Sequence, residues 1–483
     1  MPPARNRRRT ENRRPGGPRK TGRPQDLVRR TAFDVIRAVE TRDAYANLLL
    51  PSRLRDRGLT GRDAALATEL TYGTLRGRGT YDAVLALCSD RELRRIDAPL
   101  LDVLRLGTHQ ILATRIPPHA AVGTAVELAR SVSGPGQAKF ANAVLRKVAT
   151  RDMDAWLEIV APADADTTTR LSVRHSHPKW IVSALRDAVG NSEIDELLAA
   201  DNARPRVTLV ARPGRATVQE LCDAGAEPAP YSPYGALLPE GDPASIAAVR
   251  EGRAAVQDEA SQMVALALIE APLDGPDSLW ADLCAGPGGK AGLLSALAAQ
   301  RDARLLAADV QPRRAGLVRD AVDDRTGVVA ADGTAPAWRP ASFDRVMVDA
   351  PCTGLGALRR RPEARWRRGP ESVAELGSLQ RRLLATALDS VRPGGVVAYV
   401  TCSPHLAETR VVVDDVLRER DDVERLDAPA VLTTVAPDLT GLDDGPASRV
   451  GTTPDTPRTG SYAQFWPHRH GTDAMFLALL RRT

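Results

Sequence analysis

Apolar residues recur at helical spacing through the first third of the chain. Val28, Ala32 and Val39 fall on one helical face, because residues four and seven positions apart share a side of an α-helix. Similar stripes follow in residues 62–76, 97–112, 119–131 and 137–148. Gly and Pro separate the stripes, and no long alternation typical of a strand interrupts them. The pattern predicts a compact all-helical domain over residues 26–152.

The pattern changes over residues 153–250. Asp, Ala and Thr dominate from 153 to about 170, which is typical of a domain boundary. Helical spacing returns at 175–203, and shorter elements follow. These are a strand at Arg206–Val210, a helix at 217–224 and a short strand at Ala236–Leu238. We therefore expect a small α/β domain here.

Short apolar runs alternate with helical patterns from about residue 251 onward. The runs are Leu279–Leu283, Arg304–Ala308, Val328–Ala331, Arg345–Val348 and Val396–Val400. Strands that alternate with helices predict a mostly parallel, doubly wound sheet. Ligands of such sheets bind beyond the carboxyl ends of the strands. Asp309, Asp332, Asp349 and Cys402 stand at those ends, so we expect the functional site there.

The composition fits a soluble globular protein of several domains. The chain has 483 residues, of which 43% are hydrophobic and 26% charged. The longest apolar run near mid-chain, Met263–Ile269, is far shorter than the ~20 residues of a membrane helix. Arg7–Arg9 has no apolar stretch after it, so we expect no signal peptide. Five cysteines without a C-x-x-C pair and seven scattered histidines predict no disulfide framework and no metal site. We expect a cytoplasmic monomer.

Basic side chains gather in two places. Residues 1–30 hold eleven Lys and Arg against two acidic residues, while the whole chain carries +5. Residues 1–25 lack apolar periodicity, so we expect a disordered basic tail, either an arm along nucleic-acid phosphates or a solubilising segment. The second cluster comprises Arg359, Arg360, Arg361, Arg365, Trp366, Arg367 and Arg368. Because guanidinium binds phosphate and Trp stacks on bases, we interpret it as RNA-binding, the alternative being a solvated loop whose Trp packs on the core.

A glycine-rich turn follows the first strand of the predicted sheet. Asp282–Lys290 lacks the spacing of a Walker A loop and of a regular dinucleotide loop. Asp309 follows Asp282 by 27 residues and suits a ribose with both hydroxyls free, while Asp332 suits an adenine amino group. A helix cap is the alternative role for Asp309. A nucleoside cofactor without a diphosphate fits these features, and S-adenosylmethionine is such a cofactor.

Two cysteines stand in turns at the expected functional edge, Cys352 and Cys402. A thiolate that adds to C6 of cytosine makes C5 nucleophilic enough to attack a sulfonium methyl group. An acid near N3 and N4 would stabilise the adduct, and Asp349 is placed for that. The second thiol would assist elimination. Spacing alone leaves open which cysteine attacks.

Several of these segments resemble one known family, the RNA cytosine-5 methyltransferases. The similar segments are Asp282–Lys290, Asp349–Cys352, Thr401–Ser403, Gln257–Gln262 before the first motif, and the closing Asp473–Phe476. In the helical region, Asp63–Arg76 and Phe140–Arg146 resemble the NusB-like RNA-binding domain. The combination is similar to bacterial Sun/Fmu-type enzymes, which methylate a cytosine of small-subunit (16S) ribosomal RNA.

The resemblance implies a multidomain fold with assigned roles. The domains would be NusB-like and all-α (26–152), small α/β (153–250), and an α/β Rossmann-like S-adenosylmethionine-dependent methyltransferase (251–483). Cys402 would be the nucleophile, Cys352 would assist product release, and Asp349 would face both the cofactor and the flipped base. The cofactor site would comprise Cys284, Ala285, Gly286, Pro287, Gly288, Gly289, Lys290, Asp309, Asp332 and Asp349. The arginine cluster would bind RNA at the mouth of the site.

Some positions depart from the family pattern, and other functions compete. Gly286 stands where Ala is usual, Ala291 replaces a common Thr, and Ala474 and Met475 loosen the closing motif. None removes a group assigned to catalysis. The alternatives are the same chemistry on transfer RNA or another ribosomal site, and a non-catalytic ribosome-assembly factor. A DNA methyltransferase is disfavoured, because its attacking cysteine belongs to a Pro-Cys motif and this chain also carries Thr-Cys-Ser.

Overall fold

The computed structural model describes residues 26–442 and 461–483. The basic tail expected at residues 1–25 lies outside the described residues. Across the described ranges, no helix combines the length and the apolarity that a bilayer crossing requires.

The N-terminal domain is all-helical, as the apolar stripes predict. Its helices are α1 (Leu27–Arg42), α2 (Ala46–Asp56), α3 (Gly61–Arg76), α4 (Arg78–Cys88), α5 (Ala98–Ala113), α6 (Pro118–Ser133), α7 (Pro135–Val148) and α8 (Met153–Val160). Val35, Leu70 and Leu104 lie in one core that all but excludes water. Trp156 of α8 packs into the same core, so this domain extends a little beyond residue 152.

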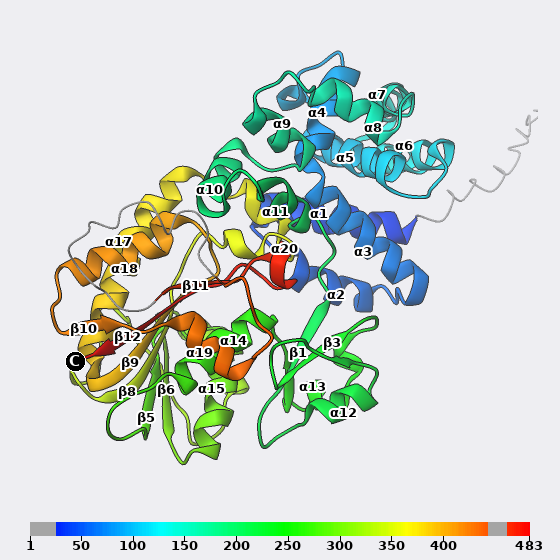
Figure 1. Cartoon of the computed structure of the whole chain (residues 1–483). Coiled ribbons are helices and arrows are strands. Elements are labelled where there is room, and N and C mark those ends of the chain that lie inside the picture. The colour runs from blue at the N-terminus through cyan, green and yellow to red at the C-terminus, as the bar shows by residue number, and fades with distance from the viewer. Residues whose placement is uncertain (1–25, 443–460) are drawn as a thin grey trace, which may run out of the picture.

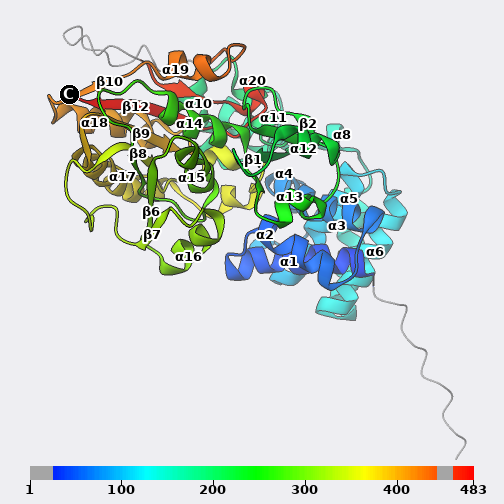
Figure 2. The same cartoon turned by 90° about the horizontal axis from the view of Figure 1, so that it is seen from below.

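The segment predicted as one small α/β domain divides into two packing units. Helices α9 (Thr167–Arg174), α10 (Lys179–Val189) and α11 (Ile194–Ala200) pack against Leu355, Leu358 and Trp466 of the C-terminal domain. The second unit is a small antiparallel sheet with strand order β2-β3-β1-β4. Its elements are β1 (Val207–Ala211), α12 (Val218–Asp223), β2 (Glu227–Pro228), β3 (Gly235–Leu238), α13 (Ala247–Arg250) and β4 (Ala254–Val256). Figures 1 and 2 show this sheet next to both larger domains.

The C-terminal domain contains an eight-stranded mixed sheet. Seven strands run in the order β10-β12-β9-β8-β5-β6-β7, and β11 pairs with β12. The strands are β5 (Leu279–Asp282), β6 (Arg304–Asp309), β7 (Gly327–Ala330), β8 (Phe343–Asp349), β9 (Val391–Thr401), β10 (Val423–Arg425), β11 (Ala463–Gln464) and β12 (Phe476–Arg482). Strands β5 to β9 are parallel and match the five predicted runs. The three antiparallel strands after β9 were not predicted.

Helices cover both faces of this sheet. They are α14 (Glu259–Glu270), α15 (Gly289–Gln300), α16 (Pro312–Ala321), α17 (Pro370–Ser390), α18 (Arg410–Arg418), α19 (Ala428–Val435) and the short α20 (Pro467–His470). Successive strand residues point to opposite faces, so Trp280 packs with α14 and α15 while Ala281 packs with α17. This buried, two-sided sheet explains why the strands are continuous apolar runs.

The strand order decides where the site forms. Strands β8 and β9 are parallel neighbours, with Asp349 opposite Val400. Their carboxyl ends therefore meet at one edge, and the turns that carry Cys352 and Cys402 lie side by side. Strand β5, which leads into the glycine-rich turn, pairs with β8 on its other side. Three motifs that are far apart in the sequence thus meet at one place.

Candidate active site

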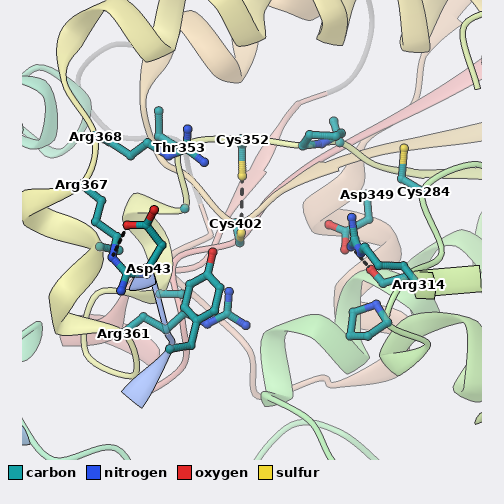
Figure 3. Close-up of a pocket in the computed structure, with 18 residues that line it drawn as sticks. Asp43, Cys284, Arg314, Asp349, Cys352, Thr353, Arg361, Arg367, Arg368 and Cys402 are labelled. Atoms are coloured by element: carbon teal, nitrogen blue, oxygen red, sulfur yellow. Dashed lines mark hydrogen bonds and ion pairs between the residues drawn. The ribbon is translucent and has the colours of Figure 1, made fainter. Parts of the chain in front are cut away.

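A cavity of about 540 Å³ opens at the carboxyl edge of the sheet. Figure 3 shows the cysteine pair in the middle of the view, with Arg361, Arg367 and Arg368 on one side of it and Asp349 and Arg314 on the other. The lining includes Cys284, Gly286, Pro287, Asp349, Cys352, Arg361, Arg367, Arg368 and Cys402, all predicted as site residues. It also includes Asp43 and Tyr45 from the helical domain and Arg314 from α16, which sequence analysis did not identify.

The two cysteines face each other. The Sγ atoms of Cys352 and Cys402 are 3.4 Å apart, as the dashed line in Figure 3 marks. Both side chains line the cavity and are partly exposed. A thiol that donates a hydrogen bond to a neighbouring thiolate stabilises the charged form of that neighbour. The pair can therefore hold one thiol and one thiolate.

Electrostatics distinguish the three cysteines of the cavity. The hydrogen bond with Cys352 lowers the pKa of Cys402, burial and the Asp349 charge raise it, and Lys290 and Arg361 lower it. The same bond, together with burial, raises the pKa of Cys352 well above its usual value. Burial raises the pKa of Cys284 as well. Because the thiolate is the nucleophilic form, these pKa directions favour Cys402 over Cys352 and Cys284 as the nucleophile.

A buried carboxylate ties the two cysteine turns together. Glu408 lies in the one-turn helix η5 (Leu406–Glu408) and is fully buried. It accepts hydrogen bonds from the Thr353 backbone N–H at 2.8 Å, next to Cys352, and from Ser403 Oγ at 2.6 Å, next to Cys402. Gln380 Nε2 donates to it at 3.3 Å. These bonds fix both turns at their spacing, and an acid five residues after Ser403 was the signal that sequence analysis missed.

The glycine-rich turn brings the backbone close to Asp309. The Gly286 N–H donates to Asp309 Oδ2 at 3.1 Å, and a Cβ at Gly286 would lie 2.3 Å from that oxygen. Glycine at this position, where the family usually has Ala, therefore permits this approach. Asp282 is fully buried, and its Oδ2 has no hydrogen-bonding partner among the described residues. Burial raises the pKa of Asp282 to about 7.

Lys290 forms an ion pair with Asp349, which lines the cavity. Lys290 Nζ donates to Asp349 Oδ2 at 2.8 Å. Burial alone would lower the pKa of Lys290, but Asp349 raises it, so the lysine stays charged. Asp332 is exposed and accepts hydrogen bonds from the N–H and Oγ1 of Thr334, its own turn. Asp332 therefore lies outside the cavity lining, and its adenine contact stays a prediction.

The structure corrects the RNA-binding role predicted for Arg359 and Arg360. Both guanidinium groups bind Asp258 and Asp473, at N–O distances between 2.6 and 3.1 Å. Asp258 begins α14 and Asp473 begins the closing segment, so the arginines join segments that are distant in sequence. Side chains so fully paired inside the protein are not available to phosphates. The sequence around Arg359 and Arg360 is rich in arginine, and their acidic partners are about 100 positions away, so the local pattern did not indicate these ion pairs.

Arg365 and Trp366 are also interior contacts. Arg365 is fully buried in η4 (Pro362–Trp366), and its guanidinium donates to Asn202 Oδ1 at 2.8 Å and to the Asp201 carbonyl at 2.9 Å. The Trp366 ring packs on Gly79 and under the Arg78 guanidinium, 5.4 Å from the ring centroid. The predicted cluster is thus mainly a domain junction. Arg361, Arg367 and Arg368 alone of its members line the cavity.

The described residues contain no group of three or more His, Cys, Asp or Glu side chains arranged to hold a metal ion.

Comparison with known proteins agrees with this arrangement. A family model described as 16S rRNA methyltransferase RsmB/F matches residues 269–481, and that of the NusB family matches residues 27–150. A protein of Mycobacterium tuberculosis (strain CDC 1551 / Oshkosh), whose name describes it as a methyltransferase, is 50% identical over 471 residues, covering 96% of this chain and 98% of that protein. The ribosomal RNA small subunit methyltransferase B of Salmonella paratyphi A is 31% identical over 441 residues, covering 88% and 97%.

A solved structure shares the whole architecture. The crystal structure of PH0851 superimposes with a TM-score of 0.75 at 21% identity, covering 96% of this chain and 100% of that one. The fold and the comparisons define the class, a methyltransferase with a Rossmann-like domain joined to a NusB family domain. The chain belongs to the RsmB/F family of 16S rRNA methyltransferases.

Proposed function

We propose that this protein transfers a methyl group from S-adenosylmethionine to C5 of a cytosine in 16S ribosomal RNA, through a covalent bond between Cys402 and C6. The observation that carries the proposal is the 3.4 Å contact between Cys352 and Cys402 at the carboxyl edge of the sheet. A paired thiol and thiolate in a cavity suit addition to a pyrimidine followed by elimination.

The residues at the glycine-rich turn fit the cofactor. The close backbone approach at Gly286, the unpartnered buried Asp282 Oδ2 and the acidic end of β6 supply acceptors for amino and hydroxyl groups. The turn Cys284–Lys290 with Asp309, Asp332 and Asp349 would hold the cofactor. S-adenosylmethionine supplies an electrophilic sulfonium methyl group when bound.

Cys402 begins the reaction by adding its thiolate to C6, which forms the S–C6 bond and makes C5 nucleophilic. Asp349 would stabilise the adduct by a hydrogen bond at N3 and N4 of the base. After C5 has taken the methyl group, a base accepts the C5 proton, and cleavage of the S–C6 bond returns Cys402 as a thiolate and restores the aromatic ring. Cys352, beside the Cys402 sulfur, would assist this elimination and product release.

The substrate is inferred to be ribosomal RNA from the family and the NusB family domain. A cytosine inside a folded RNA has to leave its stack to reach Cys402. Transfer RNA is the competing substrate for the same reaction, and it is tested separately.

The test is transfer of labelled methyl from S-adenosylmethionine to unmodified 16S ribosomal RNA, with transfer RNA alongside, for wild type and Cys402→Ala. We expect label on one ribosomal cytosine in the wild type and none with Cys402→Ala, because this substitution removes the thiolate that adds to C6. Cofactor binding of the variant should stay close to wild type. Label on transfer RNA alone would overturn the substrate, and no label on either RNA would overturn the reaction.

The roles of the two cysteines are tested by Cys352→Ala. We expect this variant to accumulate a covalent protein–RNA adduct, seen as a shifted band that resists denaturation, because elimination is impaired. An adduct with Cys402→Ala and none with Cys352→Ala would reverse the two roles.

A further inference from the structure

The loop between α1 and α2 contacts the segment that follows Cys352. The Ala46 N–H donates to buried Glu363 Oε1 at 3.1 Å, which fixes the first turn of α2 on η4. Arg367 Nη2 donates to the Val39 carbonyl at 3.1 Å and to the Ala44 carbonyl. Hydrogen bonds donated by each domain therefore join the catalytic and helical domains at the rim of the cavity.

Tyr45 projects from this loop into the cavity wall. It precedes α2, its side chain makes no capping bond, and it is 41% exposed. The guanidinium carbons of Arg361 and Arg367 each lie 5.1 Å from the centroid of its ring. An aromatic ring attracts guanidinium groups through its electron-rich face and holds them in a defined plane. Tyr45 therefore restrains two arginines that would otherwise move over many rotamers.

The restrained arginines retain donors for a ligand. A guanidinium has five N–H donors, and only Nη2 of Arg367 is bonded to backbone carbonyls. Arg361 is exposed, and its guanidinium lies over the Tyr45 ring. Arg368 is exposed beside them, and Asp43 is 4.0 Å from Arg367 Nε. The cavity mouth is thus a positive surface beside the reactive thiols.

We propose that Tyr45 is a substrate-positioning residue, which holds Arg361 and Arg367 where they bind the RNA phosphates that flank the target nucleotide. This rests on the proposed function, since the ligand is taken to be RNA. The helical domain then does more than bind RNA at a distance, because it completes the wall of the active site. Guanidinium groups that are already ordered lose less entropy when they bind phosphate.

The test compares Tyr45→Ala, Tyr45→Phe and Leu48→Ala. Leu48 is 69% exposed in the first turn of α2, three residues after Tyr45, and does not line the cavity, so it is the matched control. We expect Tyr45→Ala to raise the KM for RNA roughly five- to tenfold, from loss of two guanidinium–ring contacts. The kcat at saturating RNA and the affinity for S-adenosylmethionine should stay near wild type. Tyr45→Phe keeps the ring and should restore the wild-type KM.

Two further results discriminate the outcomes. In an Arg361→Ala/Arg367→Ala background, Tyr45→Ala should add nothing to the loss, because residues that act together are not additive. A wild-type KM for Tyr45→Ala overturns the inference while the wild-type enzyme still methylates RNA, so the proposed function survives. An equal loss with Tyr45→Phe or Leu48→Ala also overturns it. The RNA affinities of the same Tyr45 and Leu48 variants, measured in a Cys402→Ala background, give this comparison without turnover.

Discussion

At the scale of single residues, the pairing of two thiols distinguishes Cys402 from the other cysteines of the cavity. Cys402 differs from Cys284 and Cys352 through its neighbours, since all three line one cavity. The hydrogen bond from Cys352 and the charges of Lys290 and Arg361 favour its thiolate. No property of the cysteine itself makes this distinction. The difference arises from what the strand order places beside it.

This arrangement predicts a pH dependence that can be measured without RNA. The pKa of Cys402 is lowered, so its thiolate forms at a lower pH than that of an ordinary thiol. In Cys352→Ala the stabilising hydrogen bond is lost, and the midpoint of Cys402 alkylation by iodoacetamide should move to higher pH. Mass spectrometry of the Cys402 peptide follows the reaction site by site. Cys222, which lies outside the cavity, is the internal control. An unchanged midpoint would contradict the proposed role of the hydrogen bond.

At the scale of elements, the arginine-rich segment after Cys352 divides between two tasks. Arg365 is fully buried and donates to acceptors on three segments, whereas Arg368 is exposed at the cavity. Burial lowers the pKa of Arg365 to about 10, so it remains charged at neutral pH. One residue joins the domains, and the other faces the solvent that RNA would replace.

Alanine substitutions at Arg365 and Arg368 should therefore affect different properties, stability in the first case and RNA binding in the second. Arg365→Ala should lower stability by about 2–4 kcal/mol, because buried carbonyl and amide oxygens lose their donor. Arg368→Ala should change stability by less than about 0.5 kcal/mol and should weaken RNA binding. Thermal melting followed by near-ultraviolet circular dichroism measures the first effect, and RNA titration measures the second. A loss of stability with Arg368→Ala, or none with Arg365→Ala, would reverse this assignment.

At the scale of the whole molecule, charge should dominate RNA affinity. Aromatic residues make up only 4% of the chain, so few bases can stack on side chains. Three arginines of the predicted cluster stand at the cavity, while Arg359 and Arg360 are paired with Asp258 and Asp473 inside the protein. Phosphate contacts release counterions, so binding should weaken steeply as salt rises.

The number of cavity arginines sets the expected change in that salt dependence. Arg361→Ala/Arg368→Ala should reduce the slope of log K against log salt by about 1.4, at about 0.7 for each phosphate contact with single-stranded RNA. Arg304→Ala/Arg325→Ala removes the same charge at exposed positions away from the cavity and should leave the slope unchanged. Filter binding between about 50 and 200 mM salt is sufficient. Equal slopes for the two double variants would exclude a phosphate role for the cavity arginines.

The sequence by itself determined the elements and the chemical groups. Helical spacing marked the N-terminal domain, and apolar runs marked the five parallel strands, because local periodicity reflects which side of each element is buried. The motifs around Cys352 and Cys402 were identified because turns after parallel strands carry functional side chains. The antiparallel strands β10 to β12 were not predicted, since the segment around Asp473–Phe476 was interpreted only as a motif.

Only the tertiary structure decided the neighbours. The pairing of β8 with β9 placed two sulfurs 3.4 Å apart, although Cys352 and Cys402 are 50 positions apart in the sequence. The burial of Arg365 and the contact of Tyr45 with two arginines depend on segments about 160 to 320 positions away. Charge, hydrogen bonding and burial act through space, and a linear pattern records which groups exist but not which groups meet.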